Sequence, residues 1–255
     1  MTARKRATAI ASLILAGLLL TGCVYLRLLQ LKWQLASFDE YVEVEHKDGL
    51  AFVFKKPLLL TDDMRWLGFF PSETEKDGEF DHWNMIFDKQ YKEPSDEPDI
   101  YDMSVQLTFE EERLKSLRLS EAYLAIIPAD LLVTMARSLG GAEIDRKNRT
   151  ASVSIEDDED GTTYEFTVPT IEDTITLLGK PYRESKEEMS VINRYHYHLK
   201  RPKDKEKADA KKPVYWIEMT FDSETGKLRR TLGDFYGGTL DIRFPPPDSS
   251  EKESE

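Results

Sequence analysis

Hydrophobic and polar residues alternate along several short stretches of this chain, and this alternation predicts β-strands. Val42 and Val44 stand between charged residues, the turn signal Asp48-Gly49 follows, and residues 50–54 form an apolar run. An Asp-Gly pair between two such runs is typical of a β-hairpin. We expect three further strands near residues 82–87, 101–109 and 114–119.

Helical segments flank these strands. The apolar runs at 25–38 and 128–139 predict two helices, and shorter helices are expected at 61–68 and 170–178. The acidic pairs Asp62-Asp63 and Glu172-Asp173 fall in the first turns of these shorter helices, where the helix dipole favours negative charge. Helix capping therefore explains these carboxylates better than catalysis does.

The two halves of the chain resemble each other at a nearly constant spacing, which indicates an internal duplication. The matching anchors, 112 positions apart, are Asp48-Gly49 with Asp160-Gly161, Pro57 with Pro169, Trp83 with Tyr195, and residues 105–109 with 217–221. We expect an α+β fold of antiparallel sheets with helices on one face. The expected plan is two tandem repeats, each of helix, hairpin, helix and three strands.

The first residues read as an export signal. Three basic residues at positions 4–6 precede an apolar run at 7–20, which is shorter than the ~20 residues that span a bilayer. The following Leu20-Thr21-Gly22-Cys23 resembles the lipobox of bacterial lipoproteins. The resemblance implies a diacylglyceryl group and palmitate on Cys23 and cleavage before it. The alternative is a plain signal peptide or a signal anchor. Val24, in place of Asp, implies the outer membrane with the protein facing the periplasm.

Charge and cysteine content limit the partners. The 255 residues include 48 acidic and 35 basic side chains, a net charge of −13 that disfavours nucleic acid. The single cysteine excludes an internal disulfide. We expect a signal peptide at 1–22, a first repeat at 23–122, a second at 123–244 and a disordered acidic tail at 245–255. Loss of the three basic signal residues lowers the net charge to −16.

The second half also resembles a known lipoprotein module. Its motifs are the helix at 170–178 ending in Leu178-Gly179-Lys180-Pro181, the strand Tyr195-His196-Tyr197, and Phe221-Asp222 before Gly226-Lys227-Leu228. This pattern resembles the BamE (SmpA/OmlA) type of lipoprotein module. The resemblance implies a non-enzymatic outer-membrane lipoprotein that supports assembly of envelope machinery. The first half matches only loosely, since Phe69-Phe70-Pro71 replaces Gly-x-Pro.

Few residues suggest chemistry. His196 and His198 lie two apart, on one face of the expected strand, but a zinc site needs a third ligand. The acidic run at 156–161 resembles a calcium loop that lacks its closing Glu, because Thr167 stands there, so a charged turn is the better account. Nucleophile, phosphate-loop and dinucleotide motifs are absent from the sequence. We therefore expect no enzyme, no cofactor and no metal.

The hypothesis that follows is a lipid-anchored periplasmic scaffold or adaptor that binds another envelope protein. The alternative is a periplasmic carrier or sensor of an apolar ligand, held in a cleft between sheet and helices. The residues considered for the ligand or partner surface are aromatic: Trp66, Phe69, Phe70, Trp83, Tyr195 and Tyr197. The helix at 25–38 has more apolar surface than one buried stripe requires, and we expect it to pack on the sheet rather than lie at the membrane. The basic stretch at 200–212 is expected to be a solvated loop rather than a docking site.

Overall fold

The computed structural model describes residues 24–93, 99–140, 143–145, 150–152, 167–201, 214–235 and 238–244. The predicted signal, lipobox and acidic tail lie outside these residues. So do most of the hairpin expected around Asp160-Gly161 in the second repeat, the acidic run at 156–161 and almost all of the basic stretch at 200–212. The helices are α2 (Val24–Ala36), α3 (Phe38–Tyr41), α4 (Thr61–Trp66), η1 (Asp99–Tyr101), α5 (Glu121–Leu124), α6 (Ala129–Ser138) and α7 (Ile171–Leu178).

One large antiparallel sheet dominates the described structure. Its eleven strands are ordered β1-β2-β6-β5-β4-β10-β11-β12-β13, with β3 paired to β4 and β9 paired to β10. The strands are β1 (Val42–Glu45), β2 (Leu50–Phe54), β3 (Glu73–Asp77), β4 (Phe80–Gln90), β5 (Met103–Glu110), β6 (Arg113–Leu119), β9 (Arg183–Glu187), β10 (Ser190–Leu199), β11 (Val214–Asp222), β12 (Leu228–Phe235) and β13 (Gly238–Arg243). The short strands β7 (Glu143–Asp145) and β8 (Thr150–Ser152) form a separate pair.

The predicted fold class is therefore wrong. The expected plan of helix, hairpin, helix and three strands does not describe either half, because one continuous sheet of eleven strands replaces the separate sheets and the helices are few and mostly short. The strands β3 and β9 were missed because their sequences, ETEKD and RESKE, are charged along almost their whole length. Such strands lie at sheet edges, where charged side chains discourage pairing with other chains, and they carry no apolar alternation to detect.

A helix followed by four strands does occur twice in the described residues. The order α4-β3-β4-β5-β6 is matched by α7-β9-β10-β11-β12, and a register shift falls between Thr108 and Phe109 in the first and between Thr220 and Phe221 in the second. The burial patterns of β4 and β10 agree from Phe80 to Asp88 when Phe80 is placed on Ser190, a spacing of 110. The anchor that paired Trp83 with Tyr195 is thus displaced by two residues. The domain boundaries at 122 and 244 stay a prediction.

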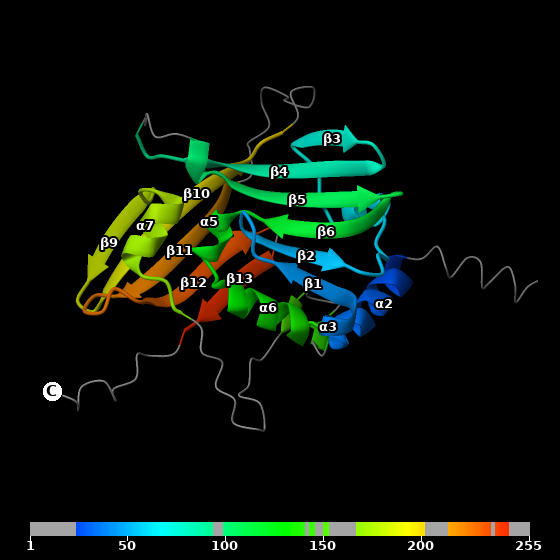
Figure 1. Cartoon of the computed structure of the whole chain (residues 1–255). Helices are drawn as coiled ribbons and strands as arrows, with labels where there is room; N and C mark the ends of the chain where they lie inside the picture. Colours follow the sequence, from blue (N-terminus) through cyan, green and yellow to red (C-terminus); the bar gives the residue numbers. More distant parts are fainter. Residues whose placement is uncertain are drawn as a thin grey trace, which may run out of the picture.

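The two four-strand groups meet through the C-terminal halves of β4 and β10. These halves pair antiparallel, with Phe87 opposite Leu199 and Lys89 opposite Tyr197. At the spacing of 110, Phe87 corresponds to Tyr197 and Lys89 to Leu199, so each pair maps onto the other. The junction is therefore a local pseudo-two-fold axis. A two-fold axis places corresponding elements on opposite sides of itself, so the corresponding helices α4 and α7 lie away from each other. Figure 1 shows α7 at one end of the molecule and α2, which neighbours α4, at the other.

A single hydrophobic core joins both groups of strands. Alternate residues of β4, β5, β10 and β11 point inward, as the period of two in a strand requires. The fully buried members include Phe87, Phe109, Tyr195, Tyr197 and Phe221. From the helices, Ile126, which follows α5, and Leu178 of α7 join the same cluster. One core therefore spans the junction between the two groups of strands.

Candidate functional site

The structure separates the six aromatic residues that the sequence proposed as a ligand or partner surface. Trp83, Tyr195 and Tyr197 are buried in the core. Phe69 packs against that core, whereas Trp66 and Phe70 are 55% and 56% exposed. None of the six lines the groove along α7 that is described below. The structure therefore does not bring these residues together as one site.

Polar groups on the inner face of β10 are buried without hydrogen bonds. The side-chain amide of Asn193 and the hydroxyls of Tyr195 and Tyr197 reach no partner of ordinary geometry in the described structure. The hydroxyl of Tyr195 lies beside Asn193, yet burial dominates and raises its pKa above the usual value for tyrosine. Burial, reinforced by the hydroxyls of neighbouring tyrosines and by Asp102, raises the pKa of Tyr197 as well.

These two tyrosines predict a loss of stability in alkali. Because the pKa of each is raised in the folded state, their contribution is fully present below the unfolded pKa of about 10 and disappears as pH rises through the folded values. We expect an absorbance titration at 295 nm to detect ionisation of these two hydroxyls only at the pH at which the chain unfolds. Circular dichroism follows the unfolding. The double variant Tyr195→Phe/Tyr197→Phe should remain folded at neutral pH and unfold at higher pH than the unmodified chain. Early titration of both hydroxyls in the folded protein would contradict their burial.

The histidine and carboxylate residues that were weighed for chemistry have structural contacts. His196 stacks on Tyr182 with ring centroids 4.2 Å apart. No group of three or more His, Cys, Asp or Glu that would suit a metal ion occurs among the described residues. The amide of Leu60 donates to Asp63 and that of Thr170 to Asp173, so both carboxylates cap their helices. The Thr170 hydrogen bonds, led by that of its amide, lower the pKa of Asp173.

Lys89 makes a structural contact that the sequence did not predict. This buried lysine donates from Nζ to the carbonyl oxygen of Leu178, at the C-terminal end of α7. The rings of Tyr91 and Tyr101 lie 4.6 and 4.9 Å from its ammonium group. A cation is favoured both at a helix C-terminus and over aromatic faces. Lys89 therefore fastens α7 to β4, across the junction of the two strand groups.

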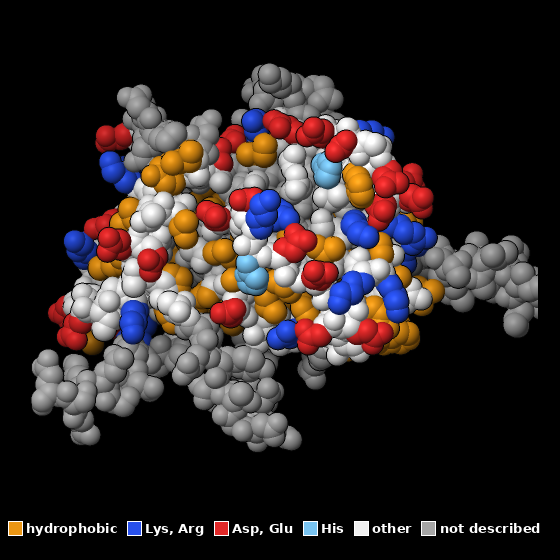
Figure 2. All heavy atoms as spheres, in the orientation of Figure 1, with side chains coloured by type: hydrophobic (Ala, Val, Ile, Leu, Met, Phe, Trp, Pro, Cys, Tyr) orange, Lys and Arg blue, Asp and Glu red, His pale blue; other side chains and the backbone are white. Residues whose placement is uncertain are grey.

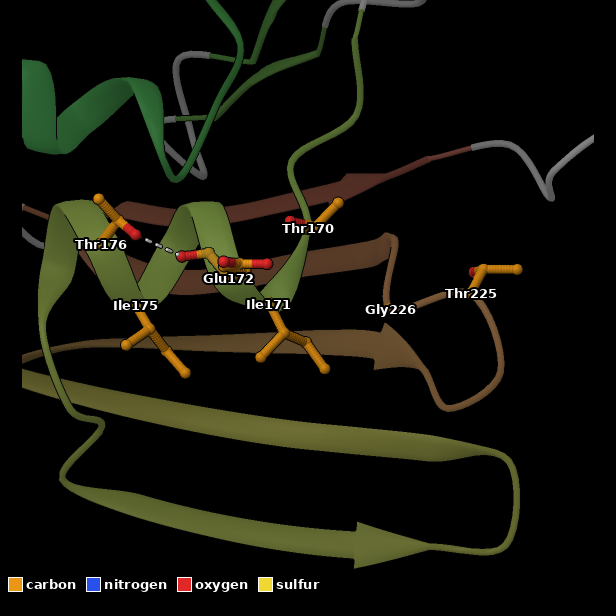
Figure 3. Close-up of a pocket in the computed structure, with 7 residues that line it drawn as sticks. All are labelled: Thr170, Ile171, Glu172, Ile175, Thr176, Thr225 and Gly226. Atoms are coloured by element: carbon orange, nitrogen blue, oxygen red, sulfur yellow. Dashed lines mark hydrogen bonds between the residues drawn. The ribbon is translucent and has the colours of Figure 1, made fainter.

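A groove runs along α7 and forms the candidate site, which we call the α7 groove. Its lining residues are Thr170, Ile171, Glu172, Ile175, Thr176, Thr225 and Gly226, and its volume is about 510 Å³. Figure 3 shows Ile171 and Ile175 pointing to the same side of the helix, as residues four apart do. The open groove thus offers two isoleucine side chains beside hydroxyl groups and the carboxylate of Glu172. Ile175 is 37% exposed.

Hydrogen bonds hold the groove in one shape. The amide of Ile171 donates to the carbonyl oxygen of Gly226 at 3.0 Å, and Leu228 donates back to Pro169 at 2.9 Å. The turn before β12 is fixed by Asp222, which accepts hydrogen bonds from Thr225 and Arg229. These bonds, led by that from the Thr225 amide, hold the pKa of Asp222 far below its usual range. The groove is therefore preformed.

A second exposed apolar surface lies at the opposite end, around α2 and α4. We call it the aromatic patch, and it consists of Tyr25, Leu29, Trp33, Trp66, Leu67 and Phe70. The rings of Tyr25 and Trp66 meet edge to face with centroids 5.3 Å apart. The expectation that the helix at 25–38 packs wholly on the sheet is thus wrong for its outer side. Only Trp66 and Phe70 of this patch were identified from the sequence as a possible surface.

Arg27 and Asp63 join α2 to α4 beneath this patch. The guanidinium Nε and Nη2 donate to the two carboxylate oxygens at 2.6 and 2.5 Å, and Asp63 is only 3% exposed. Burial alone would raise the pKa of Asp63, but the hydrogen bonds from Arg27 and the Leu60 amide lower it below the usual value. Sequence reasoning missed this pair, because its partners are 36 residues apart.

Comparison with protein-family models, curated proteins and solved structures found no match. The resemblance to BamE-type modules therefore stays a prediction. Among the described residues, no helix has the length and hydropathy needed to cross a membrane.

Proposed function

We propose that this chain is a lipid-anchored scaffold or adaptor of the bacterial outer membrane. Lipid on Cys23 holds it at the periplasmic face, and it binds another envelope protein without catalysing a reaction. The α7 groove is the binding site for that partner. The observation that carries this proposal is a preformed, partly apolar groove at the opposite end of the molecule from α2, the helix that directly follows Cys23.

The chemistry of the groove defines the partner. Ile171 and Ile175 favour apolar side chains, and the hydroxyls of Thr170 and Thr176 together with Glu172 favour hydrogen-bond donors around them. Met189, which is 79% exposed, adds apolar surface at the same end of the sheet, since its carbonyl oxygen accepts from the amide of Ser223 in the neighbouring turn. A protein segment with two or three apolar anchors and a basic or amide group fits this surface.

Site-specific photocrosslinking in intact cells tests the groove. A benzoylphenylalanine residue in place of Met189 should give one discrete adduct with a second envelope protein. In the same chain, Ile175→Glu should reduce that adduct about tenfold or more, because a charge in an apolar contact loses at least ~1.4 kcal/mol of binding free energy.

The matched control places the same photoreactive residue at Glu43, an exposed position on the edge strand β1. We expect no corresponding adduct from this position. Identical adducts from positions 189 and 43, or an adduct that Ile175→Glu leaves unchanged, would overturn the α7 groove as the binding site.

A further inference from the structure

The outer side of α2 is apolar although its inner side already packs on the protein. Leu28 and Leu31 contact the core, whereas Tyr25, Leu29 and Trp33 are 62%, 44% and 63% exposed. Residues four apart lie on one face of an α-helix, so these three side chains form a continuous outward stripe. Helices at the surface of soluble domains place polar residues on this side. The packing of the described residues therefore does not explain this stripe.

The aromatic patch extends this stripe onto α4. Tyr25 contacts Trp66 at the end of α4, and the exposed Leu67 and Phe70 lie within four residues after Trp66. Figure 2 shows hydrophobic side chains gathered at the lower right of the molecule, over α2 and α3. An exposed apolar stripe that continues through the contact of Tyr25 with Trp66 marks a site of contact with a membrane or another protein.

The orientation of the aromatic patch relative to the rest of the domain is fixed. The bidentate contact of Arg27 with Asp63 fastens α2 to α4. Near the other end of α2, the backbone approaches Gly140 so closely that a Cβ atom there would lie 2.3 Å from the amide nitrogen of Ala36. Because both ends of the helix are held, the stripe cannot turn inward without breaking these contacts.

Helix α2 itself adds no negative charge to the aromatic patch. Its thirteen residues include Lys32 and Arg27, which pairs with Asp63, and no carboxylate, in a chain whose net charge is −13. The acidic excess, which would repel an anionic membrane, therefore lies on other elements.

We propose that the aromatic patch lies on the surface of the bilayer that holds the lipid of Cys23. This inference rests on the anchor of the proposed function, because Tyr25 is two residues from Cys23 and thus within about 7 Å of it along the chain. Tryptophan and tyrosine rings favour the headgroup level of a membrane, and an amphipathic helix in the interface buries its apolar face there. The patch would orient the domain so that the α7 groove points away from the membrane.

Tryptophan quenching by brominated lipid tests this orientation. The chain from Cys23 to Glu255 is coupled through its only thiol to a maleimide phospholipid in vesicles of phosphatidylethanolamine and phosphatidylglycerol. When the acyl chains carry bromine, we expect strong quenching from Trp33 and Trp66, which are exposed. The variant Trp33→Phe/Trp66→Phe retains Trp83, which is 1% exposed, and Trp216, and should lose that quenching.

The matched control is Ile175→Gln/Met189→Gln, which changes exposed apolar residues at the other end and should keep full quenching. A vesicle-coupled chain without quenching would overturn the membrane contact, even if cells lipidate Cys23. The vesicle experiment attaches the lipid chemically, so it does not depend on lipidation in cells. A chain that cells fail to lipidate would therefore overturn the anchor of the proposed function without changing the quenching result.

Discussion

Replacing Cys23 by Ser is expected to abolish incorporation of labelled palmitate into this protein in bacterial cells. The lipobox resemblance assigns the thiol of Cys23 as the only acceptor of the diacylglyceryl group, and a serine hydroxyl cannot form the thioether. Each buried methylene contributes about 0.8 kcal/mol to membrane binding, so two or three acyl chains provide a stable anchor where one chain is marginal. Palmitate labelling followed by intact-mass measurement gives the result directly.

Val24→Asp is the matched control at the next position. It leaves the thiol intact and should keep full palmitate labelling, but an Asp directly after the lipidated Cys predicts a shift from the outer to the inner membrane. An unmodified chain that takes up no palmitate would contradict the anchor. Labelling that persists in Cys23→Ser would contradict Cys23 as its site.

Asp63→Ala is expected to lower the free energy of unfolding more than alanine at an exposed carboxylate does. Removing one partner of a buried ion pair leaves an uncompensated charge, here that of Arg27, and typically costs 3–5 kcal/mol. Since Arg27 is partly exposed, at 14%, we expect about 3 kcal/mol, the lower end of that range. Urea unfolding followed by circular dichroism measures this loss, and hydrogen exchange should show faster exchange throughout α2.

Asp62 offers a control on the same helix turn. Its carboxylate pairs with Arg65 at 2.9 Å but is 86% exposed, so Asp62→Ala should change the free energy of unfolding by less than about 1 kcal/mol. The double variant Arg27→Met/Asp63→Leu removes both charges and should recover most of the loss. Equal effects of Asp62→Ala and Asp63→Ala would contradict the buried pair.

The elements that the sequence predicted correctly are those with a local signal. The hairpin of β1 and β2 follows from alternating residues around Asp48-Gly49, and a positive φ of 54° at Asp48 and 111° at Gly49 confirms the turn. The capping roles of Asp63 and Asp173 follow from their places in the first helical turn. The strands β3 and β9 were missed because an exposed, charged edge strand has no hydrophobic period.

The site was less predictable because exposure depends on neighbours that are distant in sequence. Trp66 and Trp83 look alike as aromatic residues, yet one is 55% exposed and the other lies in the core. Ile171 and Ile175 have the helical spacing of core residues, and only the arrangement of the turn at Thr225 and Gly226 leaves a groove beside them. No local pattern encodes that arrangement.

The sequence alone determined the positions of most strands, the helix caps, the acidic charge and the single cysteine within a lipobox-like motif, because each depends on a few adjacent residues. Only the tertiary structure decided that β4 and β10 pair into one eleven-stranded sheet. That pairing depends on backbone hydrogen bonds, which every residue type offers, so the sequence does not specify it locally. The same pairing buries Tyr195 and Tyr197, sends α4 and α7 to separate ends, and so creates two distinct exposed surfaces.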